Sequence, residues 1–235
     1  GDHRDLHLSL RRQRQMCIRD SYVIMATKMG QVKKTSLEQY SRPRSNGINA
    51  ITVKDGDELL EAKLTNGNSQ IMLAVKSGKA IRFEEGKTRP MGRNASGVRG
   101  IKLKSNDYVV SMSIVNQDVK QYVLSVTENG FGKRTLVDDY RITNRGGQGV
   151  ANIECSDRNG PVVSSYIVSS DDEIMLVTNV GKLIRLKVHE NENNSIRVTG
   201  RKTQGVKLFD VSDDEKVVSV ALLLDNDNND DDDDS

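Results

Sequence analysis

Basic residues stand at fixed distances from glycines along this 235-residue chain. A Lys or Arg follows each of four glycines by four positions, and Lys33 and Lys133 directly precede two of these bases. The glycines are Gly30, Gly78, Gly130 and Gly181, and the bases are Lys34, Arg82, Arg134 and Arg185. Ammonium and guanidinium groups bind phosphate oxygens, so this repetition indicates a binding surface for a polyanion.

A second basic pattern precedes a second set of glycines, each followed by Ile or Val. In three of four cases Arg stands both eight and four residues before the glycine. These sets are Arg89, Arg93 and Gly97; Arg141, Arg145 and Gly149; and Arg197, Arg201 and Gly205, with Lys202 beside the last arginine. The first case, at Gly47, has Gln39 and Pro43 at those positions, with Arg42 and Arg44 beside them.

Both patterns belong to an internal repeat. The segments YVIMATKMGQVKKT, IMLAVKSGKAIRF, YVLSVTENGFGKRT and IMLVTNVGKLIRL align, with turn glycines 48, 52 and 51 residues apart. Apolar β-formers flanking a glycine turn predict a β-hairpin. With two further strand-like elements, each repeat unit offers about four short strands in about 50 residues, which is typical of one blade in a radial all-β array. Two unrelated β-sandwiches are the alternative.

A radial array places equivalent residues at equivalent positions on its rim, so repeated bases form a periodic basic band. Few aromatic residues are available to stack on unpaired bases, which favours duplex DNA over single strands as the partner. Contacts of this kind reach the DNA backbone, so we expect weak sequence preference. The alternative is that these charges only solvate strand surfaces.

Composition excludes several other classes of protein. No apolar run approaches the length of a membrane span, and the N-terminal residues lack the apolar region of a secretory signal. Cys17, Cys155 and three His at scattered positions predict neither a disulfide framework nor a metal site. No nucleophile motif or paired acid and base predicts catalysis by this chain.

Five motifs are similar to the C-terminal domain of the bacterial DNA gyrase A subunit over residues 22–224. They are QVKKTSLEQY, GVRGIKL, NGFGKRTLVDDYR, DEIMLVTNVGKLIRLKV and GRKTQGVKLFDV. The resemblance implies a propeller-like β-pinwheel with blades at about 22–68, 69–117, 118–170 and 171–224, the last four of six. It implies a rim that wraps duplex DNA, as part of a type IIA topoisomerase that introduces negative supercoils.

The same resemblance implies the partners and cofactors. The catalytic Tyr, ATP and Mg belong to other parts of the complete enzyme, so no cofactor is expected in this chain. The expected protein partners are the rest of the A subunit and the B subunit in an A2B2 heterotetramer. The expected location is the bacterial cytoplasm, at the nucleoid.

The family's signature box resembles Gln-Arg-Arg-Gly-Gly-Lys-Gly, and TNRGGQG at 143–149 is the nearest match. The matching residues are Arg145, Gly146, Gly147 and Gly149, and the mismatches are Thr143, Asn144 and Gln148. We therefore expect a box-like segment rather than the box. The topoisomerase IV A subunit, whose pinwheel usually lacks the box, is the alternative within the class, and a protein-interaction propeller is the alternative outside it.

The two ends of the chain differ from the repeats. Residues 1–21 include SLRRQRQMCIRDS, which resembles translated sequencing-adapter read-through, and a disordered basic arm is the alternative. Residues 225–235 hold seven Asp and predict a disordered tail that either aids solubility or competes with DNA for the basic rim. Omitting the tail leaves 35 bases against 26 acids (33 − 7), so the body is basic. Whether the blades close, stay as an open arc or associate along an edge is left open.

Overall fold

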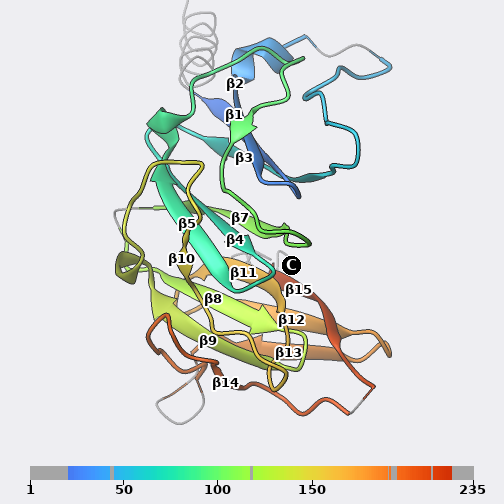
Figure 1. Ribbon diagram of the computed structural model, residues 1–235, viewed down its shortest axis with the longest axis vertical. Helices are drawn as coiled ribbons and strands as arrows, with labels where there is room; N and C mark the ends of the chain where they lie inside the picture. The colour runs from blue at the N-terminus through green and yellow to red at the C-terminus, as the bar shows by residue number, and fades with distance from the viewer. Residues whose placement is uncertain are drawn as a thin grey trace, which may run out of the picture.

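The structure, a computed structural model, describes residues 21–42, 45–116, 119–189, 191, 195–212 and 214–223. Over these ranges the chain forms β-strands and three short 3-10 helices, arranged in four antiparallel sheets. Figure 1 shows the sheets following one another from β1–β3 at the top to β12 and β13 at the bottom. The predicted all-β, propeller-like class is confirmed. The expectations for residues 1–20, Arg44 and the acidic tail lie outside the described residues.

Each repeat unit contributes a β-hairpin and a later strand that pairs with the first strand of that hairpin. The hairpins are β1 (Tyr22–Thr27) with β2 (Gln31–Ser36), β4 (Gln70–Val75) with β5 (Lys79–Glu84), β8 (Tyr122–Thr127) with β9 (Phe131–Leu136), and β12 (Glu173–Thr178) with β13 (Leu183–Lys187). The later strands are β3 (Leu59–Thr65), β7 (Val109–Val115), β11 (Val162–Val168) and β15 (Val217–Leu223). Glycine turns flanked by apolar β-formers thus fold as the sequence predicts.

The repeat units exchange strands, which the sequence pattern did not reveal. The two-residue strands β6 (Val98–Arg99), β10 (Val150–Ala151) and β14 (Val206–Lys207) pair with β2, β5 and β9 of the preceding unit. The resulting sheet orders are β3-β1-β2-β6, β7-β4-β5-β10 and β11-β8-β9-β14. The fourth sheet, β15-β12-β13, has three strands in the described part of the chain.

The apolar core lies between successive sheets. Ile24 of the first unit shares a buried cluster with Leu73 of the second, Met72 of the second with Tyr140 of the third, and Leu124 of the third with Ile174 of the fourth. The strands β3, β7, β11 and β15 contact one another in series, so they lie nearest the axis of the array. The exchanged strands occupy the opposite edge of the first three sheets, which is the outer rim.

The segments that carry the exchanged strands run along this rim, and we call them connectors. Connectors 2, 3 and 4 are residues 88–102, 140–154 and 195–208; connectors 2 and 3 follow the helices η2 (Glu85–Lys87) and η3 (Val137–Asp139). Connector 1, residues 45–52, comes after η1 (Leu37–Tyr40). Bridges between Lys34 and Pro90, Arg82 and Ile142, and Arg134 and Val198 fix connectors 2 to 4 against the preceding sheets. Within the described ranges, no helix is long and apolar enough to cross a membrane.

Candidate nucleic-acid interface

Three arginines occupy the same exposed position at the outer rim. Arg89, Arg141 and Arg197 each directly precede the connector residue that bridges to the preceding sheet. The bridge fixes the backbone at this point, and in all three connectors the arginine side chain is exposed to solvent. These positions place one exposed guanidinium group on each of three successive blades, and their contact with DNA stays a prediction.

The second arginines of the pattern are half-buried and contact the preceding connector. Arg145 donates from Nε to the carbonyl oxygen of Lys87 at 2.9 Å and from Nη1 to that of Arg99 at 3.1 Å. Arg201 donates in the equivalent way to the carbonyl oxygen of Ala151 at 3.2 Å. A guanidinium carries five N–H donors, so these contacts orient the group and leave other donors for a ligand. The equivalent Arg93 is also half-buried.

Lys33 and Lys133 are fully buried, which contradicts their predicted contact with DNA. Lys133 Nζ donates to the carbonyl oxygens of Gly200 at 2.6 Å and Arg201 at 2.9 Å. Lys33 Nζ donates to the carbonyl oxygens of Ala50 and Arg93. Burial lowers the pKa of both lysines, to about 8 for Lys133, where the charge of Arg201 adds to the effect. These lysines hold the connector segments that carry Arg93 and Arg201.

Lys34, Arg82 and Arg134 are buried as well, and their prediction as DNA contacts is also wrong. Arg82 donates to the side chain of Gln70 at 2.7 Å and to the carbonyl oxygen of Val137 in the next unit at 2.8 Å. Arg134 donates to the carbonyl oxygen of Ile196 at 2.6 Å, again in the next unit. Burial lowers the pKa of both arginines. The repeated base therefore joins one blade to the next.

The fourth copy of this base differs from the other three. Arg185 is exposed and forms an ion pair with Glu173 in its own sheet rather than with a following unit. Arg42, near the first connector, is exposed, and Lys202 is exposed on the fourth. These three side chains are exposed to solvent, and their contact with DNA stays a prediction.

The glycines of the box-like segment pack against protein. Gly146 N–H donates to the carbonyl oxygen of Gly100 at 2.6 Å, and Lys102 N–H donates to that of Gly147 at 2.8 Å. A Cβ at Gly149, where φ is +73°, would lie 2.5 Å from the Ala80 carbonyl oxygen. The Gly146 N–H therefore already has a hydrogen-bond partner within the protein. These glycines allow connector 3 to approach connector 2 and β5 closely.

Several exposed bases on the same rim were missed by the sequence reasoning. Arg99 and Lys207 lie on the exchanged strands β6 and β14, and Lys87 and Lys102 flank the ends of connector 2. Arg99 and Lys207 both stand two residues after a second-set glycine. That spacing was the available signal, but the other two units have Asn49 and Ala151 there.

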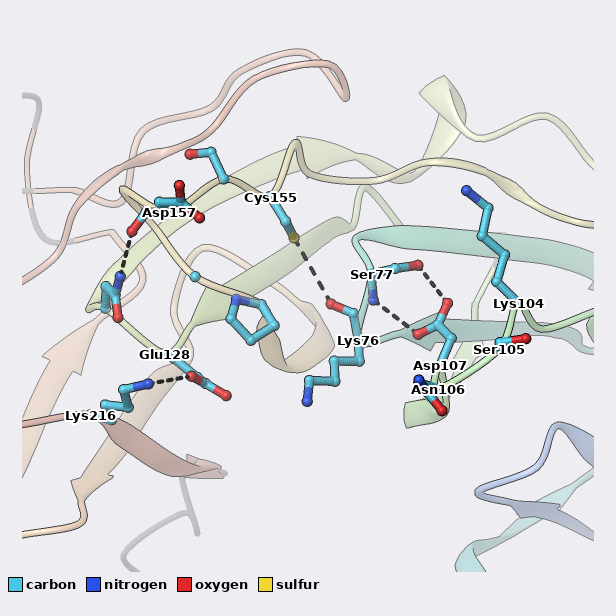
Figure 2. A pocket seen from close by; sticks show the side chains of 14 residues that line it. Lys76, Ser77, Lys104, Ser105, Asn106, Asp107, Glu128, Cys155, Asp157 and Lys216 are labelled. Atoms are coloured by element: carbon cyan, nitrogen blue, oxygen red, sulfur yellow. Dashed lines mark hydrogen bonds and ion pairs between the residues drawn. The ribbon is translucent and has the colours of Figure 1, made fainter.

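A cavity of about 610 Å³ offers a different electrostatic environment. Three lysines and three acids line it, namely Lys76, Lys104, Lys216, Asp107, Glu128 and Asp157. Figure 2 shows a hydrogen bond from Ser77 to Asp107, an ion pair between Lys216 and Glu128, and the Cys155 thiol directed to the Lys76 carbonyl oxygen. Burial raises the pKa of that thiol. The balanced charge makes this cavity a poor site for a polyanion, in contrast to the rim.

Comparisons with known proteins agree with the repeat and the fold. The family model described as DNA gyrase C-terminal domain, beta-propeller, matches residues 21–66, 70–116, 121–169 and 172–223. The DNA gyrase A subunit of Salmonella typhimurium is 48% identical over 198 residues, which cover 84% of this chain and 22% of that protein. The chain thus spans about a fifth of the length of the curated relatives it matches.

Two solved structures are similar in fold. The C-terminal domain of DNA topoisomerase IV has a TM-score of 0.80 at 26% identity, covering 87% of this chain and 62% of that one. The DNA gyrase A C-terminal domain has a TM-score of 0.76 at 26% identity, covering 88% and 67%. With four matched repeats and a close relative among gyrase A subunits, this chain belongs to the DNA gyrase C-terminal domain family of β-propellers.

Proposed function

We propose that this chain is the DNA-binding module of a DNA gyrase A subunit and that duplex DNA lies along its outer rim. The observation that carries the proposal is the exposure of Arg89, Arg141 and Arg197 at one equivalent position of three successive blades. A periodic row of guanidinium groups matches a periodic row of phosphates on a bent duplex.

The energetics favour binding through contacts with the DNA backbone, with an affinity that depends on the shape of the duplex. Smoothly bending a site of 20–30 base pairs costs about 1–6 kcal/mol, and the release of counterions at each contacted phosphate offsets that cost. Arg99 and Lys207 widen the basic rim beyond the arginine row. Arg145 and Arg201 are held by carbonyl oxygens of the preceding connector, so each adds a basic group at a fixed position on the connectors.

The identity to a gyrase A subunit supports gyrase over topoisomerase IV as the enzyme concerned. In this proposal the chain contributes four blades of a six-bladed array to an ATP-dependent type II topoisomerase that introduces negative supercoils. DNA cleavage and the ATP and Mg sites lie elsewhere in the complete enzyme. The rest of the A subunit and the B subunit are its protein partners, as A2B2, in the bacterial cytoplasm at the nucleoid.

Duplex affinity measured against salt concentration tests the proposal. Fluorescence anisotropy with two unrelated duplexes of equal length should give nearly equal affinities. The logarithm of the binding constant should fall linearly with the logarithm of salt, by about 0.9 for each phosphate contacted. Weak binding with a flat salt dependence would favour a protein-interaction propeller instead, and a strong preference for one duplex would indicate base readout.

A further inference from the structure

Connectors 2, 3 and 4 each expose an apolar side chain beside the rim arginine. The residue that directly follows this arginine is apolar in all three connectors, namely Pro90, Ile142 and Val198. All three are exposed to solvent, Ile142 by 48% and Val198 by 44%. A single exposed apolar residue is ordinary on a protein surface. Its repetition at one position of three successive blades, within a basic rim, indicates a common role.

The backbone holds these three apolar residues in the same way. The residue after each of them donates its N–H to the carbonyl oxygen of a repeated base in the preceding sheet, at 2.8, 2.9 and 2.8 Å in connectors 2, 3 and 4. The donor and acceptor pairs are Met91 and Lys34, Thr143 and Arg82, and Thr199 and Arg134. Because these hydrogen bonds join main-chain atoms, they do not depend on which apolar side chain is present.

In connectors 3 and 4 the side chain of the same base holds the other side of the apolar residue. Arg82 Nη1 donates to the Tyr140 carbonyl oxygen at 3.2 Å, and Arg134 Nε donates to that of Ile196 at 2.6 Å. Each acceptor stands two residues before the apolar one. One buried arginine therefore fixes the chain on both sides of an exposed apolar side chain. We define the connector tips as the pairs Arg89-Pro90, Arg141-Ile142 and Arg197-Val198.

Basic groups flank the apolar residue of each tip on both sides along the chain. One arginine directly precedes it, and a second stands three residues after it, namely Arg93, Arg145 and Arg201. A nucleic-acid strand offers the complementary order, because each sugar ring lies between two phosphates. Guanidinium groups bind phosphate oxygens, and the carbon atoms of the sugar provide an apolar surface between them. The tips therefore suit the backbone of a nucleic acid in both charge and polarity.

Building on the proposed function, we infer that the apolar residue of each connector tip packs against deoxyribose while the neighbouring arginines bind the adjoining phosphates. Every nucleotide of DNA presents the same sugar, so this contact adds affinity without base readout. The added affinity comes from apolar surface removed from water and not from counterions released at phosphates. It therefore leaves the slope of the binding constant against salt unchanged.

An apolar contact with the sugar also distinguishes DNA from RNA. Ribose carries a 2′-hydroxyl group, which is both a hydrogen-bond donor and an acceptor. Against Ile142 or Val198, this hydroxyl would lose hydrogen bonds to water and gain none from the side chain. Because Arg82 and Arg134 fix the backbone of these tips, the apolar side chains are held in place and do not adapt to the hydroxyl. Ile142 and Val198 are thus specificity-determining residues that favour DNA over RNA.

Fluorescence anisotropy of the whole chain with a DNA duplex and an RNA duplex of the same sequence tests this inference. The double variant Ile142→Ala, Val198→Ala removes two apolar tips and keeps every basic residue. Its DNA affinity should fall about tenfold with an unchanged salt slope, whereas its RNA affinity should hardly change. The ratio of DNA to RNA affinity should therefore decrease about tenfold. Both side chains are already exposed, so the fold should persist, as circular dichroism and thermal unfolding can verify.

Two further variants serve as controls. Leu64→Ala, Val218→Ala alters two exposed apolar residues of β3 and β15, nearest the axis of the array, and should bind both duplexes as the wild type does. Ile142→Val, Val198→Ile keeps both tips apolar and should retain the affinity and the preference for DNA.

The outcomes separate this inference from the proposed function. If the double alanine variant keeps the DNA affinity of the wild type, or the wild-type ratio of DNA to RNA affinity, the inference is overturned and the proposed function stands. A decrease in the salt slope of that variant would also overturn the inference, because the apolar side chains would then only position the arginines. A wild type that binds neither duplex would overturn both.

Discussion

Lys34 Nζ lies 2.9 Å from Glu85 Oε1, and both side chains are buried although they belong to different repeat units. Glu85 also accepts hydrogen bonds from Thr65 Oγ1 at 2.7 Å and from the Ser69 N–H at 3.2 Å. The carboxylate thus joins β3 of the first sheet, Lys34 of β2 and the start of the second unit. An interblade contact of this kind depends on both charges being present.

Removal of one member of this pair should destabilise the protein strongly. Glu85→Ala leaves the Lys34 ammonium buried without its partner, and we expect a loss of about 3–5 kcal/mol in the free energy of unfolding. Urea denaturation measures this loss. The double variant Lys34→Met, Glu85→Leu should lose less, because no unpaired charge remains. The exposed pair Lys207–Asp210 is the control, and a Glu85→Ala loss no larger than that of Asp210→Ala would contradict this account.

Lys133 should make stability depend on pH in the alkaline range. Its pKa is about 8 in the folded protein against an ordinary value of 10.5. At a pH below both pKa values, Lys133 is charged in the folded and in the unfolded state, and burial of the charge destabilises the folded state. As pH rises from 8 toward 10.5, the folded state loses the proton while the unfolded state keeps it, so the contribution of Lys133 to stability rises.

Urea unfolding of the wild type and Lys133→Met at a series of pH values isolates this contribution. The difference in unfolding free energy between the two proteins should shift in favour of the wild type as pH rises through this range. Lys202→Met alters an exposed residue nearby, so its unfolding free energy should change with pH in parallel with that of the wild type. Parallel curves for the wild type and Lys133→Met would show that burial does not perturb this lysine.

The rim arginines should account for the salt dependence of DNA binding. Replacing Arg89, Arg141 and Arg197 together by Gln should lower duplex affinity equally for unrelated sequences. The salt slope should decrease by about 0.9 for each phosphate that the variant no longer neutralises. The cavity in Figure 2 provides a control with the same change in net charge, because Lys76, Lys104 and Lys216 can be replaced by Gln. Equal losses of affinity for both triple variants would point to net charge alone rather than to the rim.

Two turn glycines should differ in their tolerance of a side chain. Both Gly78→Ala and Gly181→Ala place a Cβ on a left-handed residue, which costs about 1–2 kcal/mol. At Gly78 the new Cβ also lies 2.2 Å from the Ile153 carbonyl oxygen, so connector 3 must move. Thermal unfolding should therefore show a clearly larger loss of stability for Gly78→Ala. Similar losses at both sites would mean that connector 3 adapts freely.

Much of the fold was predictable because its signals are local. A glycine turn between two runs of β-formers specifies a hairpin whatever surrounds it, and four copies at a nearly constant spacing predict a radial array. The exposed arginines were also predictable as a set, since Arg89, Arg141 and Arg197 keep one distance from a following glycine. Strand exchange was not predictable, because Val98-Arg99 pair with β2 from 66 residues earlier (98 − 32), and no local pattern encodes that partner.

The sequence by itself determined that basic residues repeat at fixed intervals, and therefore which kind of ligand these residues can bind. Only the tertiary structure decided which of them face solvent. Lys34 and Arg89 are equally regular in the sequence, yet Lys34 is buried beside Glu85 and Arg89 is exposed on a connector. The physical reason is that exchange brings the carboxylate or carbonyl groups of the next unit over Lys34, Arg82 and Arg134. Arg185 pairs with Glu173 of its own sheet in the described part of the chain and remains at the surface.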